Sequence, residues 1–331
     1  MNPQQIREQF VAFQRSRILL TAFELEIFTL LDKGSQTSKS ISTTLKADHR
    51  ATDHLLNALC ALGFLDKNNG EFSNKDFAAE YLVKEKPGFM SGLYHIVHLW
   101  ESWSGMTDVI RTGSPANIKA IDDRGAKWLN AFIESMHNRA QQQAKASVEG
   151  INMKNVVKML DVGGGSAAFT MAFIRAKEDI RATVFELPNV VPITQKYIEK
   201  AGFVGKIDTY EGNYYTDELP RGYDLVFLSA IVHANSYKEN EELINKCAKA
   251  LNPGGQLVIQ DFIMEDDRTK PTHGAIFALN MLTGTETGDT YTESEIKEWM
   301  TKAGLSDFKR LDQPFGTGQI IGVCKGGQVC S

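Results

Sequence analysis

The segment LDVGGGSAAF, residues 160–169, is the strongest indicator of architecture in this chain. Apolar residues running to Val162 predict a β-strand, three glycines then turn the chain, and a helix is expected from about Ala167. Glycine permits a tight turn and lets a ligand approach the backbone, and free N–H groups at the start of a helix attract an anionic group. We therefore expect a ligand at the carboxyl end of this strand.

From about residue 151 onward, short apolar runs alternate with helical stretches. The runs are VVKMLDV, ATVFEL, KIDTYEG, YDLVFLSAIV and QLVIQDF, and a further helix is expected from about Tyr237. Short apolar strands separated by helices of about 10–15 residues are typical of a parallel sheet covered on both faces. We predict an α/β, Rossmann-like doubly wound domain over residues 151–325.

Residues 1–150 are expected to be mostly helical. Apolar positions recur at helical spacing in AFELEIFTLL and LLNALCAL, and GFLDKNNGEFSNK places an Asn-Asn-Gly turn between Leu65 and Phe72, which predicts a β-hairpin. Two helices followed by a small hairpin are the order of a winged helix-turn-helix.

A winged helix can bind DNA, so the charge of this module decides between two roles. Residues 15–86 contain ten basic and ten acidic residues, and the helix expected from about Asp48 carries Asp53 beside a single Arg50. A phosphate backbone requires a basic face. The count favours an interaction or dimerisation role, with DNA binding as the alternative.

The composition narrows the class of protein. The 331-residue chain is 42% hydrophobic and 23% charged, with a formal net charge of −5. These values exclude a disordered or fibrous protein and give no basic surface for nucleic acids or anionic membranes. The N-terminal residues carry charges where a signal peptide needs an apolar core, and no apolar run approaches the ~18 residues that span a bilayer. We expect a cytoplasmic protein.

The cysteines give no sign of a metal site. Cys60, Cys247, Cys324 and Cys330 form no CxxC pair and no cluster with histidines at ligand spacing. In a cytosolic chain of this size we expect reduced thiols and no bound metal.

Two signals beside the glycine loop indicate a nucleoside cofactor. Gly163, Gly165 and Ala168 match G-x-G-x-x-G/A, and Glu186 ends the next predicted strand 23 residues after Gly163, where a carboxylate can accept both ribose hydroxyls. NAD and S-adenosylmethionine both fit. Asp161 favours S-adenosylmethionine, because a carboxylate there suits an amino group and a sulfonium but repels a pyrophosphate.

At these motifs the sequence resembles the two-domain class I O-methyltransferases, which include plant caffeate and flavonoid enzymes, hydroxyindole O-methyltransferase and bacterial tailoring enzymes. The likeness runs from the N-terminal helices through HLWESWSGMTDVIRTG to AGLSDFKRL. It implies S-adenosylmethionine as cofactor, S-adenosylhomocysteine as product and a homodimer. It further implies that residues 1–150 form a winged-helix-like dimerisation and acceptor-pocket domain.

The resemblance also implies which residues bind the cofactor. The family's acidic-residue-Leu-Pro motif falls on Glu186 and Leu187, where the acid binds the ribose. GNYY, residues 212–215, resembles the segment that reaches the adenine amino group, with Asn213 in place of the usual Asp and Tyr214 after it. Ser229 stands where a Lys is often found, four residues before the family's catalytic histidine.

That histidine falls on His233, in LSAIVHANSYKENEELINKC, and the carboxylate that orients it falls on Asp261. Taken alone, His233 lies where a strand gives way to a loop, the edge at which open α/β sheets bind ligands, although a half-buried packing histidine is the alternative. The family's acceptor pocket falls on four residues, to which His137 is a possible addition: Phe132, Met136, Asn280 and Met281.

Three departures bear on the acceptor. Ala234 and Asn235 replace the usual Asp-Trp after the histidine, Ser229 replaces the Lys, and Thr290 replaces a second pocket carboxylate. They point away from plant phenylpropanoid substrates and towards bacterial-type members.

We expect S-adenosylmethionine-dependent O-methylation of a small aromatic hydroxyl compound, with His233 as general base. Two alternatives remain. One is an enzyme of the same fold with C- or N-methylation or cofactor-assisted hydroxylation; the other is a DNA-binding winged-helix regulator.

Overall fold

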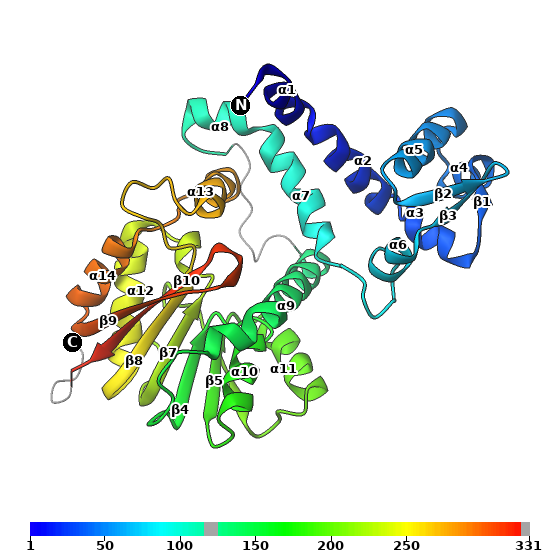
Figure 1. Cartoon of the computed structure of the whole chain (residues 1–331). Helices are drawn as coiled ribbons and strands as arrows, with labels where there is room; N and C mark the ends of the chain where they lie inside the picture. The colour runs from blue at the N-terminus through cyan, green and yellow to red at the C-terminus, as the bar shows by residue number, and fades with distance from the viewer. Residues whose placement is uncertain (116–124, 326–331) are drawn as a thin grey trace. The chain divides into compact units, whose positions relative to one another are not determined.

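The computed structural model describes residues 1–115 and 125–325, and the chain divides into two compact units, Met1–Trp100 and Glu101–Ser331 (Figure 1). The division at Trp100 falls within helix α7 (Leu93–Ser104).

The first unit combines helices with a small sheet of order β1-β3-β2. Its elements are α1 (Pro3–Val11), α2 (Phe13–Glu24), α3 (Ile27–Leu30), η1 (Leu31–Lys33), β1 (Gln36–Thr37), α4 (Ser38–Leu45), α5 (His49–Ala61), β2 (Leu65–Asn68), β3 (Glu71–Asn74) and α6 (Asp76–Tyr81).

The predicted hairpin is confirmed in this unit. Strands β2 and β3 pair antiparallel, and the turn residues Asn69 and Gly70 both have positive φ, of 49° and 81°, as a two-residue hairpin turn requires. Leu65 and Phe72 point into the core with α5, whose N-cap Asp48 accepts a hydrogen bond from the backbone N–H of Ala51 at 2.8 Å. The order of a winged helix is therefore present.

The second unit is the α/β domain. Its elements are α8 (Met106–Thr112), α9 (Ala126–Val148), β4 (Lys158–Val162), α10 (Ala168–Ala176), β5 (Arg181–Glu186), α11 (Val191–Lys200), β6 (Ile207–Glu211), β7 (Tyr223–Ser229), η3 (Val232–Ala234), α12 (Tyr237–Ala250), β8 (Leu251–Asp261), α13 (Thr272–Gly284), α14 (Glu293–Lys302), β9 (Leu305–Asp312), η4 (Pro314–Gly316) and β10 (Gly318–Cys324).

The sheet has the order β6-β5-β4-β7-β8-β10-β9, and the strands from β6 to β8 run parallel. The chain builds outward from β4 in both directions, so the switch point at which such sheets bind ligands lies between β4 and β7. The predicted Rossmann-like class is confirmed. Strands β9 and β10, which were not predicted from the sequence, complete the sheet with antiparallel pairing.

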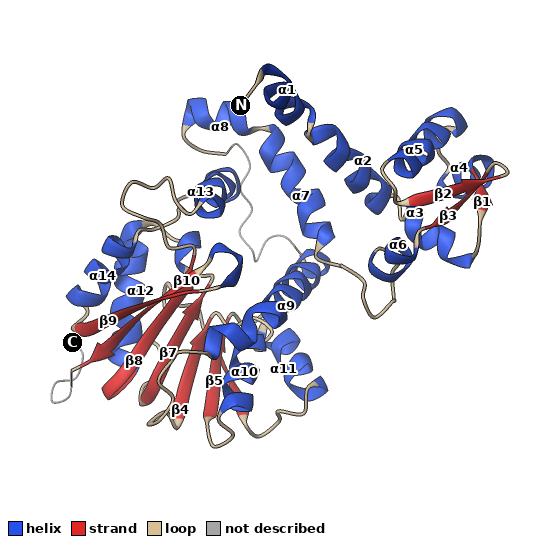
Figure 2. Cartoon of the chain, viewed as in Figure 1, coloured by secondary structure: helices blue, strands red, loops and turns tan. Residues whose placement is uncertain are grey.

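Helices cover both faces of this sheet (Figure 2). In β4, Met159 packs into the core shared with α10 and α11, and the next residue, Leu160, packs into the core shared with α12 and α14. The strands are buried on both faces, which explains why they are nearly continuous apolar runs.

Over the residues described, no helix is long and apolar enough to cross a membrane. Cys60 and Cys247 are free thiols, whereas Cys324 is disulfide-bonded, and Cys330 lies outside the described residues. The expectation of four reduced thiols is wrong at Cys324, because spacing along the chain does not show which cysteines the fold brings together.

Candidate active site

The glycine loop lies between β4 and α10, as the sequence indicates. Gly163 has φ of +70°, and a Cβ there would approach Ile231 Cδ1 to 2.5 Å. Gly165 has φ of +54°, but a Cβ there would meet nothing closer than 3.8 Å. The backbone at Gly165 is therefore open to a ligand, while Gly163 is needed for close packing against the segment after β7.

Glu186, the last residue of β5, holds this loop from the side. Its Oε2 accepts a hydrogen bond from the backbone N–H of Gly165 at 2.9 Å, and its Oε1 accepts one from that of Leu187 at 2.8 Å. Burial raises the pKa of the Glu186 carboxyl, and the two backbone hydrogen bonds oppose this rise. Each oxygen has a second lone pair that can accept a ribose hydroxyl.

Asp161 lies beneath the loop. Its carboxylate accepts a hydrogen bond from Thr170 Oγ1 at 2.5 Å, and a Cβ at Gly164 would lie 2.7 Å from its Oδ2. The pKa of Asp161 is raised to about 7, mainly by burial and to a lesser extent by the charge of Glu186, while the Thr170 hydrogen bond opposes the rise. A cationic group bound nearby would favour the ionised carboxylate.

The GNYY segment follows β6 at the same edge. A Cβ at Gly212 would overlap the Phe185 ring, so the turn requires glycine. Asn213 Oδ1 accepts a hydrogen bond from the backbone N–H of Tyr215 at 2.9 Å, and Lys246 Nζ donates to the carbonyls of Tyr214 and Tyr215. These hydrogen bonds hold the loop in a defined conformation, against which the adenine of a cofactor could pack. One lone pair of Asn213 Oδ1 is occupied by the bond within the loop.

His233 and Asp261 form the second half of the site. The His233 Nδ1 lies 2.9 and 3.0 Å from the two carboxylate oxygens of Asp261, and the two side chains are 15% and 3% exposed. Strands β7 and β8 are parallel neighbours, so their carboxyl ends bring the turn η3 next to Asp261. Because the carboxylate accepts from Nδ1–H, the neutral ring presents Nε2 as its acceptor.

The His233 ring is also held by aromatic residues that the sequence analysis missed. Phe277, on α13, meets the ring edge-on with centroids 4.8 Å apart, and Phe262 lies 4.5 Å from Phe277. The carbonyl of His233 accepts a hydrogen bond from the backbone N–H of Asp289 at 3.0 Å. Phe277 lies in FALNM, one helical turn before the predicted pocket residues Asn280 and Met281, which is the signal that could have found it.

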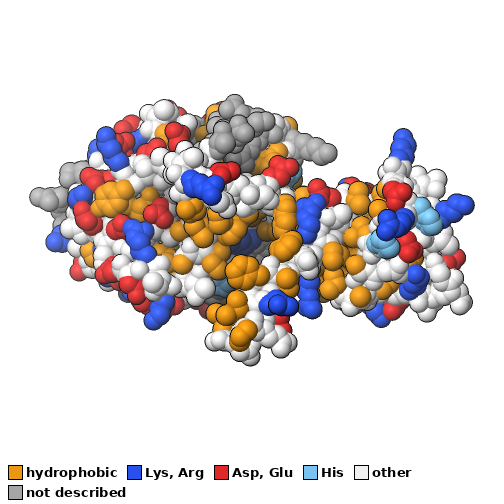
Figure 3. Space-filling model, turned by 90° about the horizontal axis from the view of Figure 1, so that it is seen from above, with side chains coloured by type: hydrophobic (Ala, Val, Ile, Leu, Met, Phe, Trp, Pro, Cys, Tyr) orange, Lys and Arg blue, Asp and Glu red, His pale blue; other side chains and the backbone are white. Residues whose placement is uncertain are grey.

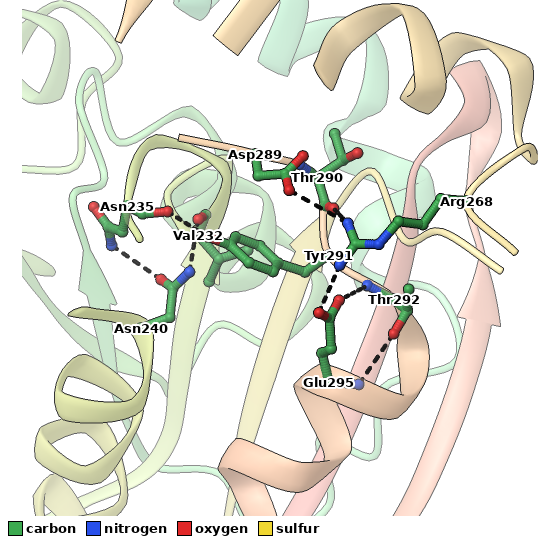
Figure 4. A network of polar contacts seen from close by, with 9 residues as sticks. All are labelled: Val232, Asn235, Asn240, Arg268, Asp289, Thr290, Tyr291, Thr292 and Glu295. Atoms are coloured by element: carbon green, nitrogen blue, oxygen red, sulfur yellow. Dashed lines mark hydrogen bonds and ion pairs between the residues drawn. The ribbon is translucent and has the colours of Figure 1, made fainter. Parts of the chain in front are cut away.

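The replacement of the usual Asp-Trp has a structural counterpart in a buried polar network centred on Asn235 (Figure 4). Asn235 Nδ2 donates to Asn240 Oδ1 at 3.0 Å, Asn240 Nδ2 donates to the carbonyl of Val232 at 2.8 Å, and the Tyr291 hydroxyl donates to the carbonyl of Asn235 at 2.6 Å. The network therefore fixes both ends of the turn that carries His233.

Asn235 also joins this turn to the GNYY segment. Its Oδ1 accepts hydrogen bonds from the hydroxyls of Tyr214 and Tyr215 at 3.2 and 2.5 Å. Burial raises the pKa of both tyrosine hydroxyls, so they remain neutral donors.

Thr290, which stands where the resemblance expected a second pocket carboxylate, lies beside Arg268. Thr290 is buried, and its carbonyl accepts a hydrogen bond from Arg268 at 2.7 Å (Figure 4). Arg268 also bonds Glu295 at 2.6 Å and lies 3.4 Å from Asp289. The carboxylate of Asp289 is thus engaged by an arginine, next to the position at which the resemblance expected an acid.

The remaining predicted residues lie on two helices. On α9, Phe132 stacks on Trp128 with centroids 5.0 Å apart, and His137 Nδ1 lies 2.8 Å from Ser166 Oγ in the glycine loop. On α13, Asn280 Oδ1 accepts a hydrogen bond from Trp103 Nε1 at 3.0 Å. Met136 is half-buried and Met281 is buried, while Ser229 Oγ accepts from Gln260 Nε2 at 3.1 Å.

The structure thus brings Glu186 to the glycine loop and Asp261 to His233. In residues 1–115 and 125–325 no group of three or more His, Cys, Asp or Glu side chains could hold a metal ion. The residues at the loop fit a nucleoside cofactor, since the Gly165 backbone is open and a carboxylate with spare lone pairs stands beside it.

A Rossmann-like sheet with these two clusters at its carboxyl edge defines a class I methyltransferase. Residues 112–306 match the family model of the O-methyltransferase domain, and residues 8–84 match that of the O-methyltransferase dimerisation domain. The chain belongs to the O-methyltransferase family and is an S-adenosylmethionine-dependent O-methyltransferase, which confirms the predicted family, enzyme class and cofactor.

Its relatives include enzymes of secondary metabolism. The chain is 30% identical over 317 residues to 3-hydroxy-5-methyl-1-naphthoate 3-O-methyltransferase of Streptomyces sahachiroi, covering 93% of this chain and 92% of that one. It is 28% identical over 317 residues to L-tyrosine C(3)-methyltransferase of Streptomyces lavendulae, covering 89% and 85%. The solved structure of PigF with SAH has the same fold, with a TM-score of 0.88 at 22% identity over 98% of this chain and 100% of that one.

Proposed function

We propose that this enzyme methylates the hydroxyl group of a small aromatic compound and that His233 is the general base. The observation that carries the proposal is the His233–Asp261 pair, in which Nδ1 is bound to the carboxylate at 2.9 Å. Among the described residues, His233 Nε2 has no hydrogen-bond partner, so it can receive a proton from an acceptor.

The protein has two tasks in this reaction. The bound cofactor supplies a methyl group attached to a sulfonium. The sulfur leaves as a neutral thioether, which needs no activation by the chain. The enzyme aligns the acceptor oxygen, which can contribute up to about 7–11 kcal/mol in well-oriented systems. His233 Nε2 removes the hydroxyl proton as that oxygen attacks, typically a 10²–10⁴-fold effect, and Asp261 stabilises the imidazolium that forms.

The comparisons support an aromatic acceptor. The Streptomyces sahachiroi relative is named for a hydroxynaphthoate, an aromatic ring that carries a hydroxyl. The aromatic side chains of Phe262 and Phe277 beside His233 suit a ring of this kind.

A second candidate is C-methylation, because one relative is named a C(3)-methyltransferase of L-tyrosine. A phenol that is deprotonated by His233 is also activated at its ring carbons, so the same base serves both reactions. Mass spectrometry of the product before and after mild alkylation of free hydroxyls separates an ether from a C-methyl phenol.

We also propose a homodimer and a division of roles along the chain. Residues 1–150 would form the dimerisation and acceptor-pocket part, and residues 151–325 the cofactor-binding part. The compact units divide at Trp100 instead, because α9 packs against α10 in the second unit. We place the functional boundary after α9, at about residue 150, because this helix carries the proposed pocket residues Phe132 and Met136.

The test of the proposal is His233→Gln, assayed by transfer of labelled methyl groups to a panel of phenols. We expect turnover to fall by roughly 10²-fold or more while S-adenosylhomocysteine still binds. The loss should shrink with more acidic phenols, which arrive already ionised. His273→Gln, which changes an exposed histidine of the same unit, is the control. Turnover of His233→Gln within a few-fold of wild type would overturn the assignment.

A further inference from the structure

Arg139 lies on the same face of α9 as the predicted pocket residues. Phe132, Met136 and Arg139 stand at positions i, i+4 and i+7 of the helix Ala126–Val148, a spacing that places three side chains in one stripe. The stripe that the family resemblance assigns to the acceptor therefore continues into a guanidinium group.

The guanidinium is connected to His233 by an aromatic row, which we define as Phe262 and Phe277. The carbon at the centre of the Arg139 guanidinium lies 5.5 Å from the centre of the Phe262 ring. The ring centres of Phe262 and Phe277 are 4.5 Å apart, and those of Phe277 and His233 are 4.8 Å apart. The cation and the imidazole thus stand at opposite ends of one aromatic row.

Arg139 is not paired with a carboxylate of the described residues, although it feels the charge of Asp261. Within the part of the chain that the structure describes, it forms no hydrogen bond or ion pair, and its interactions are with the Phe262 ring and the charge of Asp261. The Asp261 oxygens are already used, since they accept from the His233 ring and from the backbone N–H of Phe262. Arg268, in the same unit, bonds two side-chain carboxylates by contrast.

The Arg139 guanidinium is partly surrounded by protein and still accessible to a ligand. The side chain retains exposed surface, while the protein atoms around it lower the pKa of the guanidinium by desolvation and the charge of Asp261 opposes this shift. An arginine nevertheless stays charged. Its five donors are available to an incoming ligand.

We propose that Arg139 binds a carboxylate carried by the acceptor, so that the substrate of this enzyme is a hydroxylated aromatic acid. The planar guanidinium matches a carboxylate through two parallel hydrogen bonds. The aromatic row accommodates the ring between this anchor and His233, which receives the hydroxyl. This inference rests on the proposed function, because it takes His233 as the residue that faces the reacting hydroxyl.

The position of Arg139 favours the acceptor over the cofactor as the source of the carboxylate. Arg139 contacts the residue that follows β8, whereas the glycine loop follows β4, and β7 lies between these two strands. Neighbouring strands are about 4.8 Å apart, so the two positions are separated by about 10 Å. On α9, the side chains that reach the glycine loop include His137, through Ser166, and Ile133, beside Gly165.

The test compares acids with their esters. Calorimetry on the full-length protein saturated with S-adenosylhomocysteine would use hydroxybenzoates, hydroxynaphthoates and the methyl ester of each. We expect the best acid to bind roughly 10- to 100-fold more tightly than its ester, and we expect Arg139→Gln to abolish this preference. Arg139→Lys should restore only part of it, because the ammonium lacks the planar fork.

Arg175→Gln is the matched control, because Arg175 also stands over a phenylalanine ring, that of Phe203 at 5.0 Å, on α10. It should leave the preference unchanged. In turnover assays Arg139→Gln should raise KM for the acid with little change in kcat, as loss of uniform substrate binding does.

Three results would overturn the inference. The first is that no acid in the panel binds more tightly than its ester. The second is that Arg139→Gln keeps the acid preference. The third is that Arg139→Gln weakens S-adenosylhomocysteine and leaves acid binding intact, which would assign the carboxylate to the cofactor. None of these binding measurements requires turnover, so failure of His233 as the base would be seen separately in the His233→Gln assay.

Discussion

At the scale of single residues, substitution of Asp261 tests whether the His233–Asp261 pair serves catalysis or only packing. Asp261→Asn keeps the size of the side chain but removes the charge that stabilises an imidazolium, so we expect turnover to fall by about 10²-fold. Thr290→Ala should cost only a few-fold, because Thr290 donates no charge to this pair. Steady-state kinetics of the two variants, with any acceptor from the phenol panel, shows which substitution lowers turnover more. If Thr290→Ala proves the more damaging, the transfer of the catalytic set onto Asp261 is wrong.

Glu186 is the residue on which cofactor affinity should depend most. Replacement by Ala removes the two bonds that hold Gly165 and Leu187, and with them the acceptor that we propose for the two ribose hydroxyls. We expect calorimetry to show S-adenosylhomocysteine binding at least 10-fold more weakly. Glu211→Ala is the control, because Glu211 is the register partner of Glu186 at the end of β6 and is exposed. An equal loss in both variants would contradict the ribose role.

Asp161 makes a prediction about pH. The folded-state pKa is raised to about 7 from 3.8, so the unfolded chain loses this proton first as the pH rises. The free energy of unfolding should therefore fall between about pH 4 and pH 7, by up to about 4 kcal/mol from this group. Asp161→Asn should lack this part of the slope in urea titrations at successive pH values. A variant with the same pH profile as wild type would show that the Asp161 carboxyl ionises normally in the fold.

At the scale of elements, Asn235 connects the turn η3 to the GNYY segment, to α12 and to Tyr291. Asn235→Ala would remove the donor to the buried Asn240 Oδ1 and the acceptor of the half-buried Tyr214 hydroxyl, at about 1–3 kcal/mol each, and it would also remove the acceptor of the exposed Tyr215. We expect urea denaturation to show a loss of at least about 2 kcal/mol, together with weaker S-adenosylhomocysteine binding. Tyr215→Phe removes one donor and keeps the acceptor, so it should cost less. Equal free energies of unfolding for Asn235→Ala and wild type would mean that the network does not stabilise the fold.

Elements with a local signal were predictable from the sequence. The hairpin at Asn69 and Gly70 follows from a turn that needs two positive φ values, and the strand, loop and helix around Gly163 follow from glycine placement. Helix α12 begins after Ser236, whose hydroxyl accepts from the backbone N–H of Glu239 while the Glu239 side chain accepts from that of Ser236. Parallel order implied that β7 and β8 end at one edge, so a site combining His233 and Asp261 could be expected.

Features that depend on tertiary packing could not be read in this way. The antiparallel strand β9 shows little alternation of burial, because its exposed residues outnumber the buried ones at the edge of the sheet. The approach of Arg139 to Phe262 joins residues far apart in the chain, and no local pattern specifies it. The role of Asn235 was hidden for the same reason, since its partners come from three separate segments.

At the scale of the whole molecule, the charge of the first unit bears on its partner. Lys, Arg, Asp and Glu side chains are interspersed over the surface that contains α4 and α5 (Figure 3), in agreement with the balanced count along residues 15–86. A nucleic acid would find no continuous basic stripe on this face. Because residues 8–84 match the dimerisation domain of the family, the partner expected for this unit is a second copy of the chain.

The N-terminal helices supply the surface for that partner. Helix α1 has no buried residue, and Phe10 is 78% exposed. Ile6, Val11 and Phe13 are exposed as well, so α1 and the start of α2 present an apolar face to water. Such faces mark interaction sites, and residues 8–84 match the dimerisation domain of the family. We expect light scattering to give twice the 36.8 kDa mass of one chain at micromolar concentration.

Substitution of the apolar face tests its role directly. Ile6→Lys combined with Phe10→Lys introduces charges that would have to be desolvated at an interface, a cost that shifts the equilibrium towards monomer. The double variant should give the mass of one chain, with the S-adenosylhomocysteine site of the second unit still able to bind. Val204→Lys is the control, because Val204 is an apolar side chain, 70% exposed, in the second unit. A wild-type monomer, or a double variant that remains dimeric, would show that α1 does not form the interface.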